Sequence, residues 1–153
     1  MLSEIYGDLI LDHCRNPRNY GDIHNATHRI CGHNPLCGDK IELTFIVKDN
    51  HIENIKFKGK GCAISQASAS IMTNELLGKT TEEAILLFNV FHEMLTREDF
   101  SEKNIFVDSF FKKAGVFLNI KNFPTRVKCA TLAWHSFNLA LKENKPQQND
   151  NIN

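Results

Sequence analysis

Residues 41–72 have the sequence IELTFIVKDNHIENIKFKGKGCAISQASASIM, and this stretch decides the predicted fold. Apolar and more polar residues alternate over 41–47, which is typical of a half-buried strand, and an Asp49-Asn50 turn leads to a partner strand. The pattern changes at Gly59-Lys60-Gly61-Cys62, because apolar residues then recur at helical spacing as far as Leu76. The stretch therefore predicts an antiparallel pair of strands that runs directly into an amphipathic helix.

The remaining elements lie on both sides of this stretch. In chain order they are a helix that Ser3 caps and Pro17 ends, an irregular strand over 26–33, a helix opened by a Thr80–Glu83 capping box after a stop at Gly78, a shorter helix over 101–118 with Phe106, Phe110 and Phe111 facing inward, and a last helix from Pro124 to about Leu141. Strands cluster early and helices late, so the predicted fold class is α+β: a small antiparallel β-sheet of about three strands packed against several helices.

Length and composition predict one globular domain. The chain has 153 residues, of which 42% are hydrophobic and 24% are charged, values typical of a folded protein in water. We expect a single domain over residues 1–143, followed by a disordered tail over 144–153, where Asn, Gln and Asp surround Pro146. No linker or internal repeat divides the sequence.

Charge and hydropathy exclude two classes of partner. Eighteen basic residues balance eighteen acidic ones, so the net charge is zero and no long-range field attracts nucleic acid or an anionic membrane. No apolar run approaches the ~20 residues that a membrane-spanning helix needs. The N-terminus, Met1-Leu2-Ser3-Glu4, has no basic region followed by an apolar block, so no secretory signal is predicted. We therefore expect a cytoplasmic protein with neither a nucleic-acid nor a membrane partner.

Five cysteines pose the main functional question. An odd number spread along a cytoplasmic chain is not expected to form a disulfide framework, which favours metal binding or thiol chemistry. Cys14 and Cys31 are interpreted as small buried apolar residues, a common role of free cysteine. Cys37, Cys62 and Cys129 instead lie at predicted boundaries: in the loop before the best strand, in the Gly-rich turn at a helix start, and near the start of the last helix.

The surroundings of these three cysteines favour the thiolate, the form that binds metal or attacks sulfur. Helix N-termini carry partial positive charge, and Arg126 and Lys128 add to it beside Cys129. Asp39, two residues after Cys37, offers a harder oxygen ligand. Three thiolates and one carboxylate would form a closed tetrahedral zinc site or would anchor an iron–sulfur cluster. The ligands are dispersed and include no Cys-x-x-Cys pair, so spacing alone leaves scattered structural cysteines as the alternative.

Other catalytic patterns are weak or missing in the sequence. The seven histidines include no His-Glu-x-x-His motif, which disfavours a zinc hydrolase of that type. The serines include no Gly-x-Ser-x-Gly elbow, and Gly59-Lys60-Gly61 lacks the third glycine of a dinucleotide fingerprint. His33 lies near Cys37 and is either a ligand or base or, as we favour, a solvated loop histidine.

Four segments of the chain carry a resemblance to a known family. They are Asp12-His13 with Asn16-Pro17-Arg18-Asn19, then Asn34-Pro35-Leu36-Cys37-Gly38-Asp39, then Gly59-Lys60-Gly61-Cys62-Ala63-Ile64-Ser65 with Ala67-Ser68-Ala69-Ser70, and finally Phe123-Pro124-Thr125-Arg126-Val127-Lys128-Cys129-Ala130. In this order they resemble the iron–sulfur cluster assembly proteins of the SufU/IscU type, also called NifU N-terminal-like. The resemblance covers about residues 4–142 and implies a SufU/IscU-like fold.

Two subtypes of that family do different work. IscU-type proteins are scaffolds on which a [2Fe–2S] cluster is built, and they carry a histidine just before the last cysteine, where this chain has Lys128. SufU-type proteins have lysine there and an extra segment before the last helix, which here corresponds to roughly residues 92–113. The resemblance therefore favours the SufU subtype, whose members bind zinc and relay persulfide sulfur from a SufS-type cysteine desulfurase to a SufBCD-type scaffold complex.

The SufU resemblance implies the activity of a zinc-dependent sulfurtransferase and a role for individual residues. Cys37, Asp39, Cys62 and Cys129 would be the zinc ligands, and Cys37 would accept sulfur once a histidine of the desulfurase replaces it at the metal. Arg126 would support thiolate and persulfide sulfur electrostatically and could also meet the desulfurase, so Cys37 and Arg126 are the catalytic candidates. The alternative for Arg126 and Lys128 is that both are solvated basic residues at a helix start. Two alternatives stay open. One is a scaffold that assembles a [2Fe–2S] cluster on the same four residues and transfers it to apo-proteins, and the other is a zinc-stabilised adaptor that activates the desulfurase only by binding.

Overall fold

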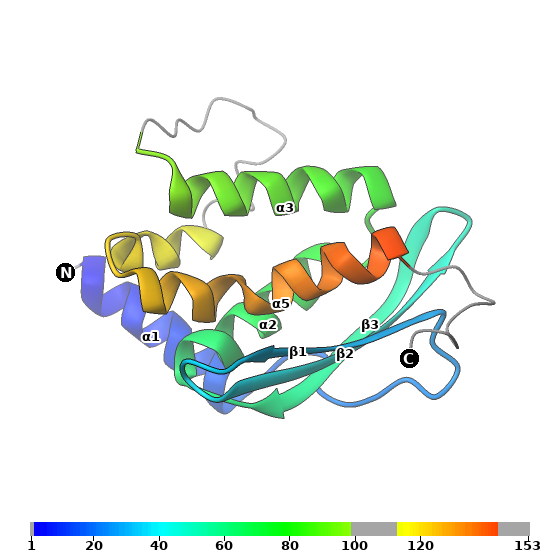
Figure 1. The fold of residues 1–153 in the computed structure, drawn as a ribbon, viewed down its shortest axis with the longest axis horizontal. Helices are drawn as coiled ribbons and strands as arrows, with labels where there is room; N and C mark the ends of the chain where they lie inside the picture. Colours follow the sequence, from blue (N-terminus) through cyan, green and yellow to red (C-terminus); the bar gives the residue numbers. More distant parts are fainter. Residues whose placement is uncertain (1, 99–112, 144–153) are drawn as a thin grey trace.

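A computed structural model describes residues 2–98 and 113–143 of the chain (Figure 1). In chain order its elements are α1 (Leu2–Arg15), β1 (His28–Asn34), β2 (Asp39–Lys48), β3 (His51–Lys60), α2 (Ala63–Leu76), α3 (Thr81–Thr96), the 3-10 helix η2 (Gly115–Ile120) and α5 (Pro124–Glu143). The predicted α+β class is confirmed, because the three strands form one antiparallel sheet in the order β1-β2-β3 beside several helices. Within the described ranges, no helix combines the length and the apolar character needed to cross a membrane.

The sheet follows from the alternation along β2. Ile41, Leu43 and Phe45 have no exposed surface, because their side chains point to the face that the helices cover. α5 packs against β1 and β2 while α2 packs against β3, and both helices lie on this same face (Figure 1). At the far end of the β2–β3 hairpin, Asp49 and Asn50 both have positive φ, as the predicted two-residue turn requires. The sequence therefore predicts which face of β2 is buried.

Aromatic side chains join the helices to the sheet and to one another. Phe137 of α5 packs on Phe45 of β2, with ring centroids 4.8 Å apart. Three residues earlier, Trp134 stacks on Phe91 of α3 at 4.7 Å. All four side chains are fully buried, and each contributes about 1.5–3 kcal/mol through the apolar surface it removes from water. α5 is therefore held between the sheet and α3 by a core of buried aromatic side chains.

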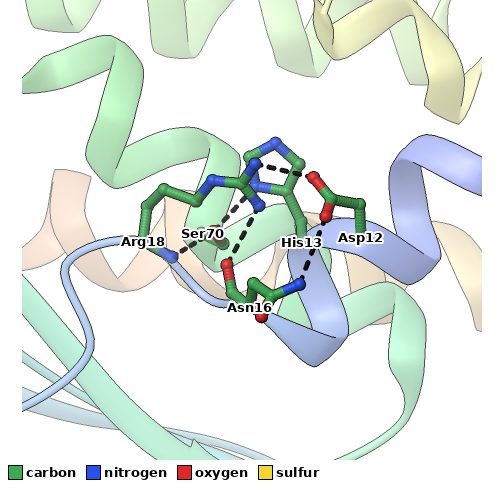
Figure 2. Close-up of polar contacts among 5 residues, drawn as sticks. All are labelled: Asp12, His13, Asn16, Arg18 and Ser70. Atoms are coloured by element: carbon green, nitrogen blue, oxygen red, sulfur yellow. Dashed lines mark hydrogen bonds and ion pairs between the residues drawn. The ribbon is translucent and has the colours of Figure 1, made fainter.

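α1 is joined to α2 through the turn that follows it (Figure 2). His13 Nδ1 and Ser70 Oγ are hydrogen-bonded at 2.8 Å, and the Arg18 backbone N–H donates to the same hydroxyl at 2.8 Å. The Arg18 guanidinium pairs with Asp12 at 2.6 Å and donates to the Asn16 carbonyl at 2.9 Å. His13 is buried, and this burial lowers its pKa, so the folded state favours the neutral ring. These contacts hold α1 and its following turn against the middle of α2.

The connection from α2 to α3 agrees with its prediction and is tied to the sheet. Gly78 has φ +84° just beyond the end of α2, and Thr80 and Glu83 form both hydrogen bonds of a capping box. The Gly78 N–H donates to the Ile52 carbonyl, and the Ile52 N–H donates to the Lys79 carbonyl, each at 2.8 Å. The C-terminal end of α2 is thereby fixed to β3.

The described part of the segment before α5 differs from the predicted α-helix. An α-helix is predicted over 101–118, but Gly115–Ile120 form a 3-10 helix, with Phe117 buried. η2 packs against α1, α3 and α5, so these tertiary contacts outweigh the local helical pattern. Residues 101–112 of that predicted helix, with its three phenylalanines, and the predicted tail over 144–153 lie outside the described residues.

Candidate metal centre

Three segments that are far apart in the sequence converge beyond one end of the sheet. They are the tip of the β1–β2 hairpin with Cys37, the β3–α2 junction with Cys62, and the beginning of α5 with Cys129. The Sγ atoms of Cys37 and Cys129 lie 2.9 Å apart, and a carboxylate oxygen of Asp39 completes a group whose ligand atoms are all within 4.8 Å of one another. Cys62 lies at the edge of this group, with its Sγ 3.9 Å from Asp39 Oδ2. The structure thus brings together all four ligand candidates.

The hairpin tip is shaped by Asn34 and Gly38. Asn34 pairs with Asp39 across β1 and β2, and its carbonyl accepts the N–H groups of Cys37 at 3.3 Å and of Gly38 at 2.9 Å. Gly38 has φ +73°, a left-handed conformation that glycine adopts without steric cost. Leu36 is 67% exposed, and Cys37 beside it is half-buried. The tip therefore presents Cys37 near the surface, whereas Asp39 is already fixed in the sheet.

Glycine is required at position 61 because the backbone passes directly over the Asp39 carboxylate. A Cβ atom on Gly61 would lie 2.6 Å from Ser65 Oγ and closer still to Asp39 Oδ1. Cys62 follows as the N-cap of α2, and its backbone N–H donates to this same Oδ1 at 2.9 Å. The start of α2 thus orients the carboxylate and leaves Oδ2 on the side of the exposed Cys62 sulfur.

Asp39 is a buried carboxylate that no described cation neutralises. Its exposed fraction is 0%, and none of the ion pairs formed within residues 2–98 and 113–143 includes it. Its carboxylate accepts hydrogen bonds from the Cys62 N–H at 2.9 Å and from the Cys62 thiol at 3.9 Å, and it also interacts with the Cys129 thiol. Because a buried anion is costly unless a positive charge or a metal ion pairs with it, this carboxylate fits a bound cation.

Cys129 is the buried thiol of the cluster. It is the sixth residue of α5 and is 4% exposed. Burial raises the pKa of its thiol, and the side chains of Cys37, Asp39 and Cys62 raise this pKa further. The expectation that the helix N-terminus favours the Cys129 thiolate is therefore wrong, since the free N–H groups belong to the first turn and Cys129 lies in the second. A metal cation would restore the thiolate, because a coordinating thiol loses its proton.

The donor set fits zinc and fits iron as well. Three sulfur atoms and one carboxylate oxygen would supply the four ligands that a closed zinc site needs. Thiolates are also the usual ligands of iron–sulfur clusters. The identity of the metal therefore does not follow from the ligands.

Arg126 and Lys128 are exposed near the start of α5 and form no hydrogen bond with the thiols. The Arg126 guanidinium stacks over the ring of Phe123, 5.4 Å from its centroid, and Phe123 is 52% exposed. Both basic side chains are exposed, and no hydrogen bond or ion pair of the described residues joins either of them to a cysteine sulfur. Support of the cluster by Arg126 therefore rests on its position and not on a direct contact.

Cys14, Cys31 and His33 lie outside the cluster. Cys14 is half-buried on α1, and Cys31 is exposed on β1, so the expected burial of Cys31 is wrong. The reason is the alternation of the strand: Gly32 faces α5, which leaves its neighbours Cys31 and His33 on the open face. His33 is exposed as expected, but it belongs to the strand and not to a loop.

Sequence reasoning missed Asn34. Its side chain is 7% exposed and contacts Cys37 Sγ directly, through a hydrogen bond from Nδ2 at 3.1 Å. A signal for part of this arrangement exists, because an asparagine that opens an Asn-Pro loop commonly forms a side-chain turn with the N–H two residues on. The contact with the sulfur depends on the three-dimensional path of that turn, and the sequence pattern does not predict this path.

Three comparisons with known proteins agree with one another. The family model described as the NifU-like N terminal domain matches residues 5–150. The iron-sulfur cluster assembly scaffold protein IscU of Streptococcus pyogenes serotype M1 is 35% identical over 148 residues, which cover 96% of this chain and 89% of that protein. The zinc-dependent sulfurtransferase SufU of Bacillus subtilis (strain 168) is 37% identical over 133 residues, 87% of this chain and 86% of that protein. The crystal structure of a proposed iron-sulfur cluster assembly scaffold protein for the SUF system, from Fervidobacterium islandicum AW-1, is similar with a TM-score of 0.79 at 35% identity, covering 90% of this chain and 97% of that one.

Proposed function

The chain belongs to the family of NifU-like N-terminal domains, and we propose that it acts in iron–sulfur cluster assembly as a zinc-dependent sulfurtransferase that accepts persulfide sulfur and passes it on. The observation that carries this proposal is the convergence of Cys37, Cys62 and Cys129 on the buried Asp39 carboxylate. The sulfur donor is a SufS-type cysteine desulfurase, and the recipient is a SufBCD-type scaffold complex. The cytoplasmic location expected from the sequence stays a prediction.

Cys37, Asp39, Cys62 and Cys129 hold the zinc ion in this proposal. When bound, zinc keeps the thiolates deprotonated and adds no redox chemistry of its own. The protein supplies the positions of the ligands: the sheet and the Cys62 N–H orient Asp39, and the core beneath α5 holds Cys129. Three of the four ligands are therefore placed by regular secondary structure or its cap.

Cys37 is the ligand best placed to accept sulfur. Cys129 is enclosed by α5 and the core, and Cys62 caps α2 while its N–H holds Asp39. Cys37 instead lies on a short hairpin tip, next to Gly38, around whose Cβ position no heavy atom lies within 4 Å. Cys37 can therefore leave the cluster with less disturbance of the fold than either of the other two cysteines.

Sulfur transfer to Cys37 is a thiol–persulfide exchange. The Cys37 thiolate attacks the sulfane sulfur of the donor's cysteine persulfide, and a new S–S bond forms at Sγ. The donor's own S–S bond breaks, and its electron pair leaves on the donor's cysteine thiolate. Cys37 then carries one additional sulfur atom, and no external oxidant or reductant is consumed. A thiolate of the next acceptor removes this sulfur by the same exchange.

Arg126 is the second catalytic candidate of this proposal. It precedes Cys129 by three residues, a spacing that places both on one side of α5. Its guanidinium is exposed and is held over the exposed ring of Phe123. A cation in this position attracts an approaching persulfide anion and gives the donor protein a charged and apolar contact beside the cluster. Lys128 is treated as a solvated basic residue.

A scaffold that assembles a [2Fe–2S] cluster and transfers it to apo-proteins is the second candidate function. It is favoured by the similarity to the IscU scaffold protein of Streptococcus pyogenes and by a donor set that suits iron. Lys128 favours the sulfur carrier instead, because IscU-type proteins are expected to have histidine at this position. The four ligand residues would be the same in both functions.

Mapping of persulfides tests the proposed function. The anaerobically purified protein is incubated with a SufS-type desulfurase and cysteine, alkylated, and analysed by peptide mass spectrometry. We expect one additional sulfur atom on Cys37 and none on Cys14 or Cys31. Reconstitution with iron and sulfide, followed by cluster transfer to an apo-protein without persulfide on Cys37, would support the scaffold. A Cys37→Ser variant that still stimulates cysteine turnover would support the adaptor and contradict the acceptor role.

A further inference from the structure

Asn34 uses both ends of its side chain within the hairpin tip. Its Oδ1 accepts the Leu36 backbone N–H at 3.1 Å, and its Nδ2 donates to Cys37 Sγ at 3.1 Å. Its backbone carbonyl also accepts the N–H groups of Cys37 and Gly38. The side chain is buried, so water does not compete freely for these bonds. One residue thus determines both the course of the tip and the surroundings of one sulfur atom.

The Leu36 N–H determines which end of the Asn34 amide faces the sulfur. If the amide were turned over, its NH₂ group would face the Leu36 N–H, and two donors would be opposed. The carbonyl oxygen must therefore face Leu36, which leaves the NH₂ group on the side of Cys37 Sγ. The turn consequently presents a donor, and not an acceptor, to the sulfur of Cys37.

This donor distinguishes Cys37 from the other two cysteines of the cluster. Within the described residues, the side-chain interactions of the Cys129 and Cys62 sulfurs are with other members of the cluster, which for Cys62 are Asp39 and Cys129. Among the residues that the structure describes, a neutral amide N–H from outside the ligand set points at the sulfur of Cys37 only. An N–H donor offsets negative charge on sulfur and restricts where the sulfur lies.

We propose that Asn34 is the positioning residue for the acceptor cysteine: its amide N–H holds the Cys37 sulfur in the cluster and supports its negative charge when Cys37 leaves the metal to attack the donor persulfide. The proposal rests on the proposed function for the transfer step, which is the thiol–persulfide exchange given above. Its contribution to metal binding is independent of that step. Asn34 acts through Cys37 and is itself neither a ligand nor a nucleophile.

Two substitutions at position 34 separate this role from a purely structural one. Asn34→Asp keeps an oxygen that can accept the Leu36 N–H, but it replaces the donor to Cys37 with a second anionic oxygen. Asn34→Ala removes both contacts. If Asn34 only shapes the turn, Asn34→Asp should resemble the wild type and Asn34→Ala should be impaired. If its N–H serves the sulfur, Asn34→Asp should be impaired at least as strongly as Asn34→Ala.

Zinc affinity and persulfide transfer are the two measurements. Zinc affinity is measured by competition with a chromophoric chelator, and transfer is measured in a single turnover from persulfidated desulfurase to Cys37, resolved by peptide mass spectrometry. We expect Asn34→Asp to lower zinc affinity by about 10–100-fold and to slow the transfer by a similar factor. Melting temperatures of the metal-loaded variants identify any loss through misfolding.

Asn54→Asp is the matched control. Asn54 Oδ1 also accepts a backbone N–H, that of Ile55 at 2.9 Å, but it lies on β3 opposite Ile46, away from the cluster. This variant should keep the zinc affinity and transfer rate of the wild type. A zinc affinity and a transfer rate of Asn34→Asp equal to those of the wild type would overturn the proposal. If the wild type itself accepts no sulfur at Cys37, the proposed function fails, whereas the order of zinc affinities still tests the role of Asn34.

Discussion

Cys37 and Cys129 have sulfur atoms in contact, yet they belong to regions of opposite character. Cys129 is buried in the second turn of a 20-residue helix whose side chains fill the core. Cys37 is half-buried on a hairpin tip between the exposed Leu36 and Gly38. The two sulfurs lie 2.9 Å apart, so the contrast lies in the backbone that supports each of them.

This contrast shows a centre with a fixed side and a displaceable side. Cys129 on α5 and Asp39 in the sheet are held by elements that cannot move without disturbing the core. Cys37 is held by the hydrogen bonds of a short tip, most of them to Asn34. A metal centre built in this way can release one ligand for chemistry and keep the others in place.

The largest effect is expected from replacing the displaceable cysteine. Cys37→Ser should lower persulfide acceptance from the desulfurase by at least about a hundredfold, because the hydroxyl cannot take over the nucleophilic role of the thiolate. Cys31→Ser is the control, since Cys31 is exposed and outside the cluster, and it should accept sulfur at the wild-type rate. Alkylation and mass spectrometry measure the persulfide. Acceptance that persists in Cys37→Ser would move the reaction to another cysteine.

Removal of the metal should have the next largest effect. A metal present at about a thousand times its dissociation constant stabilises the folded state by about 4 kcal/mol, or roughly 10 °C in melting temperature for a chain of this size. Chelation should therefore lower the melting temperature by about that amount. Hydrogen exchange should increase most at the hairpin tip and the β3–α2 junction, and least around Trp134. An unchanged melting temperature would show that no tightly bound metal joins the two sides.

Substitutions at Gly61 and Gly78 distinguish the effect of a side chain that overlaps Asp39 from the effect of backbone strain alone. Gly61→Ala should destabilise the protein by about 1–3 kcal/mol and weaken zinc binding, because its Cβ would overlap the Asp39 carboxylate. Gly78→Ala should cost about 1 kcal/mol through its positive φ alone and should leave zinc binding unchanged, since nothing lies within 4 Å of its Cβ position. Urea unfolding and chelator competition measure both effects. Equal zinc affinities of the two variants would contradict the close approach at Gly61.

The smallest effect concerns pH and the junction of α1 with α2. Burial lowers the pKa of His13, so the unfolded state, with a pKa of about 6.5, binds the proton more readily than the folded state. The stabilisation from the neutral ring is complete above about pH 6.5 and declines as the pH falls from there through the lowered pKa of the folded state. His13→Asn, which does not titrate, should therefore lose less stability than the wild type between about pH 7 and pH 5. Urea midpoints with identical pH slopes would contradict this assignment.

Local sequence patterns predicted those elements that local forces determine. The alternation over 41–47 corresponds to β2 because every inward residue of it packs under the helices. The Thr80–Glu83 pattern forms a capping box because both of its hydrogen bonds lie within one helical turn. Gly115–Ile120 differ from the prediction because packing against three other helices, which the local pattern does not contain, determines their conformation.

The sequence named the four candidate ligands but not the way in which they meet, and their role as ligands stays a prediction. Dispersed cysteines contain no information on distance, so spacing could not show that Cys37 and Cys129 meet, and the family resemblance supplied the ligand set. Asp39 is buried by segments that lie far from it in the sequence, and the contact of the Asn34 amide with Cys37 forms only when the hairpin tip folds back. The exposure of Cys31 depends on which face of β1 the helix covers. Tertiary structure determines each of these features.

The metal and acid-labile sulfide content of the anaerobically purified protein tests the central claim, that Cys37, Asp39, Cys62 and Cys129 form a zinc centre for sulfur transfer. We predict about one tightly bound zinc ion per chain and no acid-labile sulfide. Iron with a matching amount of sulfide would contradict the zinc centre and favour the scaffold. A fully folded protein with neither metal nor sulfide would contradict the metal centre itself.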